Sequence, residues 1–182
     1  MTAWSEEEVE YLRLNYPTEP NEVLEDELGR GKSSIRKKAE RIGVQRHPQF
    51  RLMKSVREAP KPNFPDEDFN NYIVGLVDGE GTFTTKGESQ HRFGIELVED
   101  DRGILEEMHD YLNVGFITEL NSTEDHHSDT VVYTVTNFGE LVCVIIPFFQ
   151  EYQPRAKQKK FDFDYWSADI LSRPDFRVER FK

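Results

Sequence analysis

The stretch "NYIVGLVDGEGTF", residues 71–83, places two acidic residues among three glycines. Gly75 and Gly79 are four residues apart, so in a helix they lie one above the other on one face. A glycine in a helix interior costs about 1 kcal/mol relative to alanine, and two on one face indicate that another backbone approaches closely. Glu80 follows directly, and its carboxylate is a hard oxygen ligand of the kind that Mg²⁺ prefers.

The partner helix is either another element or the same helix of a second copy. If it is a symmetry mate, the contact runs through Tyr72, Gly75, Leu76 and Gly79, and two Glu80 carboxylates converge near the twofold axis. Metal ions held there would activate water and stabilise both oxygens of an in-line phosphodiester displacement. Asp78 points in another direction on the helix. It is interpreted as a structural residue that caps a helix or polarises the contact between the two helices.

The elements around this stretch follow from apolar spacing. Asp66 is predicted to cap the helix that carries the motif, and Gly81 releases the chain into a strand. Residues 92–97 and 130–136 alternate between apolar and polar side chains, as strands with one covered face do. Residues 101–112 form an amphipathic helix pattern, and residues 141–149 an almost wholly apolar one in which Pro147 kinks or ends the helix.

Three short helices are predicted at the N-terminus. The first opens on the capping-box pattern of Ser5 and Glu8. The second starts with Thr18 as its cap and packs Val23 and Leu24 inward, and the third starts at Ser33. The third helix is basic, and it turns the following side chains mostly outward: Ser34, Arg36, Lys37, Lys38 and Arg41.

The charge is unevenly distributed along a chain of net charge −12. Residues 1–29 hold nine acidic side chains and one basic, whereas residues 30–61 hold eleven basic and two acidic. A basic island inside an acidic protein favours a local contact with a polyanion. Three helices ending in a basic one match the helix-turn-helix plan. DNA binding by residues 1–45 is therefore favoured over a small helical bundle that binds protein.

The N-terminal segment also resembles the Myb/SANT-like helix-turn-helix module, in which Trp4 stands at the position of a core tryptophan before the first helix. Residues 46–65 carry four prolines and no sustained apolar period, so an extended linker is predicted there. Its basic residues, including Arg46 and Arg51, either track phosphates or belong to a flexible arm. Residues 66–182 then form the larger domain.

The larger domain resembles a known family. "IVGLVDGEG", residues 73–81, is similar position by position to the motif of LAGLIDADG homing endonucleases, and the similarity continues through residues 92–117, 138–154 and 156–166. The resemblance implies an α+β fold of αββαββα order whose sheet forms a saddle over the DNA major groove. One motif per chain implies a homodimer that cleaves double-stranded DNA at a pseudo-palindromic site.

The same resemblance implies roles for individual residues. Glu80 takes the place of the metal-binding catalytic acid, with the Gly79 carbonyl as a neighbouring ligand of Mg²⁺ or another divalent cation. Lys157 falls near the basic residue that assists the active-site water and the scissile phosphate. The side chains expected to contact DNA from the larger domain are Thr82, Thr84, Lys86, Arg92, Thr134 and Lys159.

Several alternatives stay open. The larger domain is strongly acidic and Glu96 is expected to face the DNA, so a regulator that binds DNA without cleaving it is the second hypothesis, and an RNA maturase is a weaker third. High acidity is also typical of proteins from a high-salt cytoplasm, where screening weakens phosphate repulsion. His126 and His127 lie in a polar turn, where metal binding is the less favoured interpretation.

Other functional classes are disfavoured. No run of eighteen apolar residues and no signal peptide is present, so we expect a cytoplasmic protein without a membrane partner. The lone cysteine, Cys143, excludes an intrachain disulfide and fits a reducing compartment; it is interpreted as a core residue. No glycine-rich phosphate loop is present, so no nucleotide cofactor is expected.

Overall fold

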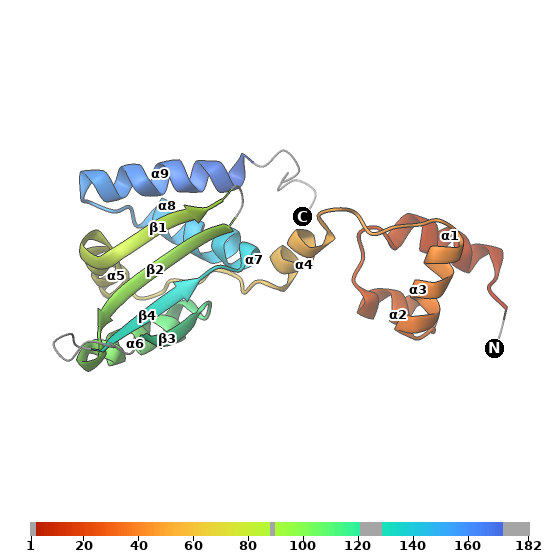
Figure 1. Ribbon diagram of the computed structural model, residues 1–182, viewed down its shortest axis with the longest axis horizontal. Coiled ribbons are helices and arrows are strands. Elements are labelled where there is room, and N and C mark those ends of the chain that lie inside the picture. The colour runs from red at the N-terminus through yellow and green to blue at the C-terminus, as the bar shows by residue number, and fades with distance from the viewer. Residues whose placement is uncertain (1–2, 88–89, 121–128, 173–182) are drawn as a thin grey trace. The chain divides into compact units, whose positions relative to one another are not determined.

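The computed structural model describes residues 3–87, 90–120 and 129–172 (Figure 1). The chain divides into two compact units, Met1–Lys54 and Ser55–Lys182. Each unit has its own cluster of buried apolar side chains. None of the helices in the described part of the chain is long and apolar enough to cross a membrane.

The N-terminal unit is helical. Its helices are α1 (Glu6–Asn15), α2 (Asn21–Leu28) and α3 (Lys32–Arg41). The predicted capping box at the start of α1 is confirmed, because the Glu8 N–H donates to Ser5 Oγ at 3.1 Å and the Ser5 N–H donates to Glu8 Oε2 at 2.7 Å. Gly29, at a φ of 59°, ends α2 in the left-handed region that glycine tolerates best.

Four apolar side chains form the centre of this unit without any solvent exposure: Leu12, Leu24, Ile35 and Ala39. Two details of the predicted second helix are wrong. Pro20 and not Thr18 stands at the N-cap, because its fixed φ suits the position before the first helical residue. Val23 is 39% exposed, because only Leu24 and Leu28 of α2 turn toward α1 and α3.

The segment predicted as an extended linker contains a helix, α4 (Phe50–Glu58). Arg46 is also not available to track phosphates. Its guanidinium lies 4.1 Å from the centroids of both the Tyr16 and the Phe50 rings and donates to the Tyr16 carbonyl and to Asn21 Oδ1. Pro48 and Pro60 therefore lie on either side of the helix, and the segment is not extended over its whole length.

The C-terminal unit is built on a four-stranded antiparallel sheet of order β1-β2-β4-β3. The strands are β1 (Gly81–Lys86), β2 (Gln90–Val98), β3 (Phe116–Leu120) and β4 (Thr130–Val135). The helical elements are α5 (Glu67–Glu80), η1 (Glu99–Asp101), α6 (Arg102–Leu112), α7 (Phe138–Glu140), η2 (Leu141–Ile145), α8 (Ile146–Glu151) and α9 (Lys157–Leu171). The predicted α+β class is confirmed.

One face of the sheet packs on helices, and α9 runs along the edge strand β1 (Figure 1). The predicted alternation is confirmed in β2 and β4, where Phe93, Ile95 and Tyr133 are fully buried in the core under the helices. Residues paired across the strands share a face, so Arg92, paired with Thr84, lies on the opposite, open face.

The predicted apolar helix is irregular at one place. Residues Leu141–Ile145 form a π-helical turn, and α8 follows with Pro147 in its first turn. Proline has no backbone N–H to donate to the carbonyl four residues earlier, and its ring crowds that carbonyl, so the regular α-helical pattern is interrupted just before Pro147. The prediction that Pro147 kinks the helix is therefore confirmed in the form of this π turn.

Candidate functional site

Helix α5 leaves one long face uncovered by the rest of the C-terminal unit. Gly75 and Gly79 are exposed, Tyr72 is 47% exposed, and Leu76 is half-buried. A Cβ built on either glycine would meet no atom of the described chain within 4 Å. The fold of a single chain therefore gives no steric reason for glycine at these two helical positions.

Glu80 is the last residue of α5, and its side chain is exposed. Gly81 begins β1 directly after it. A Cβ at Gly81 would lie 2.6 Å from Val77 Cγ1 and 2.8 Å from the Val77 carbonyl oxygen. Only glycine permits this direct passage from helix to strand, and the passage places Glu80 at the end of the uncovered face and beside the sheet.

The C-terminal end of α5 is bound to the start of α9. The Asp78 carboxylate accepts hydrogen bonds from the Arg155 N–H at 3.0 and 3.1 Å and from the Ala156 N–H at 3.1 Å. The Arg155 guanidinium donates to Asn71 Oδ1 at 3.2 Å. The interpretation of Asp78 as a structural, capping residue is supported by these bonds, but its backbone partners lie on a distant segment that local spacing could not identify.

These bonds hold the start of α9, which carries two lysines, against the C-terminal end of α5. Lys157 is the first residue of α9 and is exposed. Lys159 is half-buried, and its Nζ donates to the Gly81 carbonyl, next to Glu80. The sequence assigned Lys159 to DNA contact and Lys157 to the reaction centre. In the structure Lys159 is the lysine that is fixed at the Gly81 carbonyl, in the peptide that follows Gly81.

The donor set at this place tests whether a cation fits. No group of three or more His, Cys, Asp or Glu side chains that could hold a metal ion occurs in the described residues. In one chain the exposed Glu80 carboxylate is a hard oxygen ligand, whereas the Asp78 carboxylate is already bonded to backbone N–H groups. A Mg²⁺ ion at Glu80 would need further oxygen ligands to complete its octahedral shell.

The open face of the sheet carries polar side chains near Glu80. Thr82, Thr84, Lys86 and Arg92 are exposed on it, and Thr82 Oγ1 donates to the Gly94 carbonyl at 3.1 Å. Thr134 is only 5% exposed, and its hydroxyl accepts from Arg92 at 3.0 Å. Thr134 was predicted to contact DNA. In the structure it is placed to orient the Arg92 side chain and not to contact DNA itself.

The acidic group predicted to face DNA, Glu96, is exposed on β2. Thr130 Oγ1 donates to Glu96 Oε1 at 3.0 Å. The neighbouring part of the open face is apolar, with Val98 45%, Phe116 48% and Leu120 50% exposed. The open face therefore divides into a cationic part around Arg92 and an apolar part with one carboxylate.

The remaining predicted positions lie in separate places. In the N-terminal unit Ser34, Arg36, Lys37 and Arg41 are exposed on α3, and Lys38 is half-buried. His126 and His127 lie outside the described residues. Cys143 is half-buried, burial raises the pKa of its thiol, and its Sγ lies 3.8 Å from the Val56 carbonyl oxygen, as suits a packing residue.

Comparisons with known proteins agree with this geometry. A family model described as LAGLIDADG endonuclease matches residues 73–168. A probable intron-encoded DNA endonuclease 1 of Mycosarcoma maydis is 34% identical over 97 residues, which cover 50% of this chain and 34% of that protein. A probable intron-encoded endonuclease 2 of Neurospora crassa is 32% identical over 94 residues, covering 46% of this chain and 20% of that protein. The chain thus spans about a third or less of the length of these curated relatives.

Solved structures include one of the meganuclease I-SmaMI bound to uncleaveable DNA. It is 29% identical to this chain, covers 65% of this chain and 40% of its own, and has a TM-score of 0.49. The family model covers more than half of the chain and begins inside α5, ahead of Glu80. By this match, the chain belongs to the LAGLIDADG endonuclease family.

Proposed function

We propose that this protein is a homodimeric, metal-dependent endonuclease that hydrolyses double-stranded DNA at a pseudo-palindromic site. The observation that carries the proposal is the uncovered face of α5, where two unobstructed glycines lead to the exposed carboxylate of Glu80. One relative's name describes a DNA endonuclease and the other's an endonuclease, and this supports the assignment of the same chemistry here.

In the proposed dimer, Gly75 and Gly79 let the two α5 helices approach until their backbones are in contact. Tyr72 and Leu76 flank the glycines and become covered by the second copy. The two Glu80 carboxylates then lie near the twofold axis. This explains why a single motif per chain is sufficient for a site that must act on two DNA strands.

Glu80, with the Gly79 carbonyl, would hold a Mg²⁺ ion or another divalent cation together with its counterpart in the second copy. When bound, the cation lowers the pKa of water and neutralises charge on the phosphodiester. Lys159, fixed beside Gly81, supplies a positive charge next to the carboxylate and orients the phosphate. Lys157 is exposed at the start of α9 and contacts the phosphate from farther out.

The open face of the sheet is proposed to lie against the major groove. Arg92, Lys86, Thr82 and Thr84 present donors and hydroxyls there, with Thr134 holding Arg92 in place. Arginine bidentate to guanine is the commonest specific base contact. We also propose that residues 1–45 form a helix-turn-helix module that adds a second DNA contact through α3.

The experiment is a selection from a randomised DNA pool. Bound molecules are sequenced in Ca²⁺ and cleaved ends in Mg²⁺, with Glu80→Gln run alongside. We expect a palindromic consensus that the unaltered protein cuts and Glu80→Gln only binds. Cleavage that survives in Glu80→Gln would remove Glu80 from the reaction centre.

The second candidate is a DNA-binding regulator on the same scaffold. It is favoured by the exposed Glu96 carboxylate on the open face, where phosphate repulsion weakens binding. The same selection separates the two functions, because a regulator yields the consensus in Ca²⁺ and no cleaved ends in Mg²⁺. A parallel selection from a randomised RNA pool tests the third function, because enrichment of folded RNA there, without a consensus from the DNA pool, would indicate an intron-binding maturase.

A further inference from the structure

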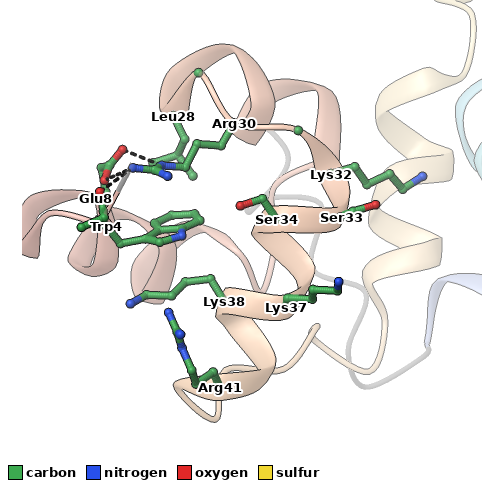
Figure 2. Close-up of a pocket in the computed structure, with 13 residues that line it drawn as sticks. Trp4, Glu8, Leu28, Arg30, Lys32, Ser33, Ser34, Lys37, Lys38 and Arg41 are labelled. Atoms are coloured by element: carbon green, nitrogen blue, oxygen red, sulfur yellow. Dashed lines mark hydrogen bonds and ion pairs between the residues drawn. The ribbon is translucent and has the colours of Figure 1, made fainter. Parts of the chain in front are cut away.

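A groove lies beside α3 in the N-terminal unit, outside the residues that the family model matches. Figure 2 shows Trp4 and Arg30 on one side of it and side chains of α3 on the other. We call it the Trp4 groove and define it by Trp4, Leu28, Arg30, Ser34, Lys38 and Arg41.

The first wall of the Trp4 groove is held in place by charge. The Arg30 guanidinium lies 4.3 Å from the centroid of the Trp4 ring. Arg30 Nε donates to Glu8 Oε1 at 2.8 Å and Arg30 Nη2 to Glu8 Oε2 at 2.9 Å, while a further bond from Arg30 Nη2 reaches the Ala3 carbonyl at 2.9 Å. A bidentate pair of this kind fixes the guanidinium plane. Because this plane lies against the half-buried Trp4 ring, Trp4 forms a preformed side of the groove.

The second wall is one stripe of α3. Ser34, Lys38 and Arg41 follow at the four- and three-residue steps that bring helical side chains onto one face. In Figure 2 these side chains extend toward the side of the helix on which Trp4 lies. Lys38 Nζ is 5.7 Å from the centroid of the Trp4 ring. The groove therefore has an aromatic wall and a cationic wall that face each other.

The charge inside the groove is not neutralised by the chain. Glu8 is the one acidic residue among those that line it, and Glu8 is already paired with Arg30. In the described residues, no ion pair joins Lys37, Lys38 or Arg41 to an acidic side chain. The acids of the unit are concentrated on α1 and α2, away from α3 in the sequence. A polyanion would therefore approach this unit from the α3 side.

The composition of α3 favours a nucleic acid over an acidic protein. The exposed residues of α3 are charged or hydroxyl-bearing, and its apolar residues Ile35 and Ala39 are fully buried. Protein interfaces have an apolar or aromatic centre that excludes water. The α3 helix offers none, and the Trp4 ring of the opposite wall is stacked against the charged Arg30 guanidinium. A helix of about 10–12 Å diameter fits the major groove, which is about 12 Å wide.

We propose that the Trp4 groove binds the phosphate backbone of duplex DNA, with Lys38 and Arg41 on the phosphates and the Trp4–Arg30 pair as the fixed opposite wall. This rests on the part of the proposed function that gives α3 a contact with duplex DNA, and it does not depend on cleavage. Ser33 and Lys37, on the neighbouring stripe of α3, then point toward the base edges while the groove holds the backbone.

The two tryptophans permit a direct test on the full-length protein. Trp166 is 2% exposed and beyond the reach of iodide, so the quenchable fluorescence belongs to Trp4. The probe is sonicated random-sequence duplex DNA in Ca²⁺. We expect iodide quenching to be lost as the protein is saturated with DNA. Saturation that leaves the quenching unchanged would overturn the proposal.

Paired variants identify the cations. Lys38→Ala combined with Arg41→Ala is expected to lower the slope of log Kobs against log[KCl] by about 1.8, because each phosphate contact contributes about 0.9. Arg13→Ala is the matched control, since it removes an exposed arginine from α1 of the same unit. Equal slopes in the unaltered protein and in the Lys38→Ala, Arg41→Ala variant would contradict the assignment of these side chains to phosphate contacts.

The outcomes also separate this proposal from the proposed function. Protection of Trp4 in a protein that never cuts DNA supports the groove and refutes the nuclease. Cutting without protection of Trp4 refutes the groove alone. Polyglutamate replaces DNA in a parallel titration, and protection of Trp4 by polyglutamate but not by DNA would show that the groove binds an acidic polypeptide instead.

Discussion

The Asp78 carboxylate accepts a hydrogen bond at 3.1 Å from the backbone N–H of Ala156, the residue directly before α9. Asp78 lies two residues before Glu80, and Lys157 directly follows Ala156. One carboxylate thus connects the helix that carries the candidate catalytic acid to the helix that carries both candidate lysines. The connection also satisfies backbone donors at the start of α9, which otherwise have no partner within that helix.

Removal of this carboxylate is expected to weaken both the fold and the reaction. Asp78→Ala leaves the N–H groups of Arg155 and Ala156 without their acceptor, and we expect a loss of about 2 kcal/mol in the free energy of unfolding, measured by urea denaturation. Asp78→Asn retains one acceptor oxygen, so its loss in the free energy of unfolding should lie between zero and that of Asp78→Ala. Asp164→Ala, which removes an exposed carboxylate of α9, is the control and should change little.

A cleavage assay extends this prediction. At protein concentrations where Asp78→Asn is fully folded, we expect kcat to fall while KM for the target stays nearly constant, because the start of α9 moves and the open face of the sheet does not. An equal fall in both constants, or none in either, would show that Asp78 supports the fold only.

The glycine face of α5 predicts opposite effects on folding and on assembly. Gly79→Ala meets no atom within 4 Å in the chain, so we expect the monomer to gain up to about 1 kcal/mol of stability. The same methyl group holds two α5 helices apart, so we expect dimers to be lost in analytical ultracentrifugation. Gly103→Ala is the matched control, because Gly103 is also helical, exposed and unobstructed. Unchanged dimers in Gly79→Ala would exclude this face as the contact.

The two lysines of α9 are expected to differ in their effect on cleavage. Lys159→Ala removes the ammonium group beside the Gly81 carbonyl, and we expect kcat to fall by about 10²-fold, as for the loss of one preorganised donor. Lys157→Ala removes an exposed cation and should mainly weaken binding and lower its salt dependence. The control is Lys160→Ala, whose Nζ is paired with Gln153 and Asp164. The reverse order of the two kcat values would restore Lys157 as the residue at the reaction centre.

The N-terminal unit should lose stability in acid through Glu8. The hydrogen bond from Arg30 lowers the pKa of Glu8 below its ordinary value. A lowered pKa contributes stability that is present above the unfolded pKa of about 4.3 and is lost as the pH falls through the lower folded value. We expect Glu8→Gln to flatten the dependence of the free energy of unfolding on pH in this range. Unfolding is monitored by Trp4 fluorescence. Glu7→Gln, an exposed neighbour in the same helical turn, should keep the profile of the unaltered protein.

Local patterns predicted much of the secondary structure. The Asp66 cap is present, with Phe69 N–H donating to its carboxylate at 2.9 Å, and the alternation in β2 and β4 identified Phe93, Ile95 and Tyr133 as core. These features depend on residues within a few positions of one another. The helix α4 was missed because the prolines on either side of it suggested an extended segment, although Phe50, Met53 and Val56 recur at the three-residue steps of an amphipathic helix.

The sequence by itself determined the candidate functional residues: the glycine pair, Glu80 at its end, and a basic α3 after two acidic helices. Residue type, helical spacing and charge are enough for that, because they are properties of short stretches. Only the tertiary structure decided that Asp78 binds Ala156, 78 residues away, that Lys159 and not Lys157 is fixed beside Gly81, and that Trp4 faces Lys38. These relationships arise when distant segments pack together, and no local period records which backbone groups will then meet.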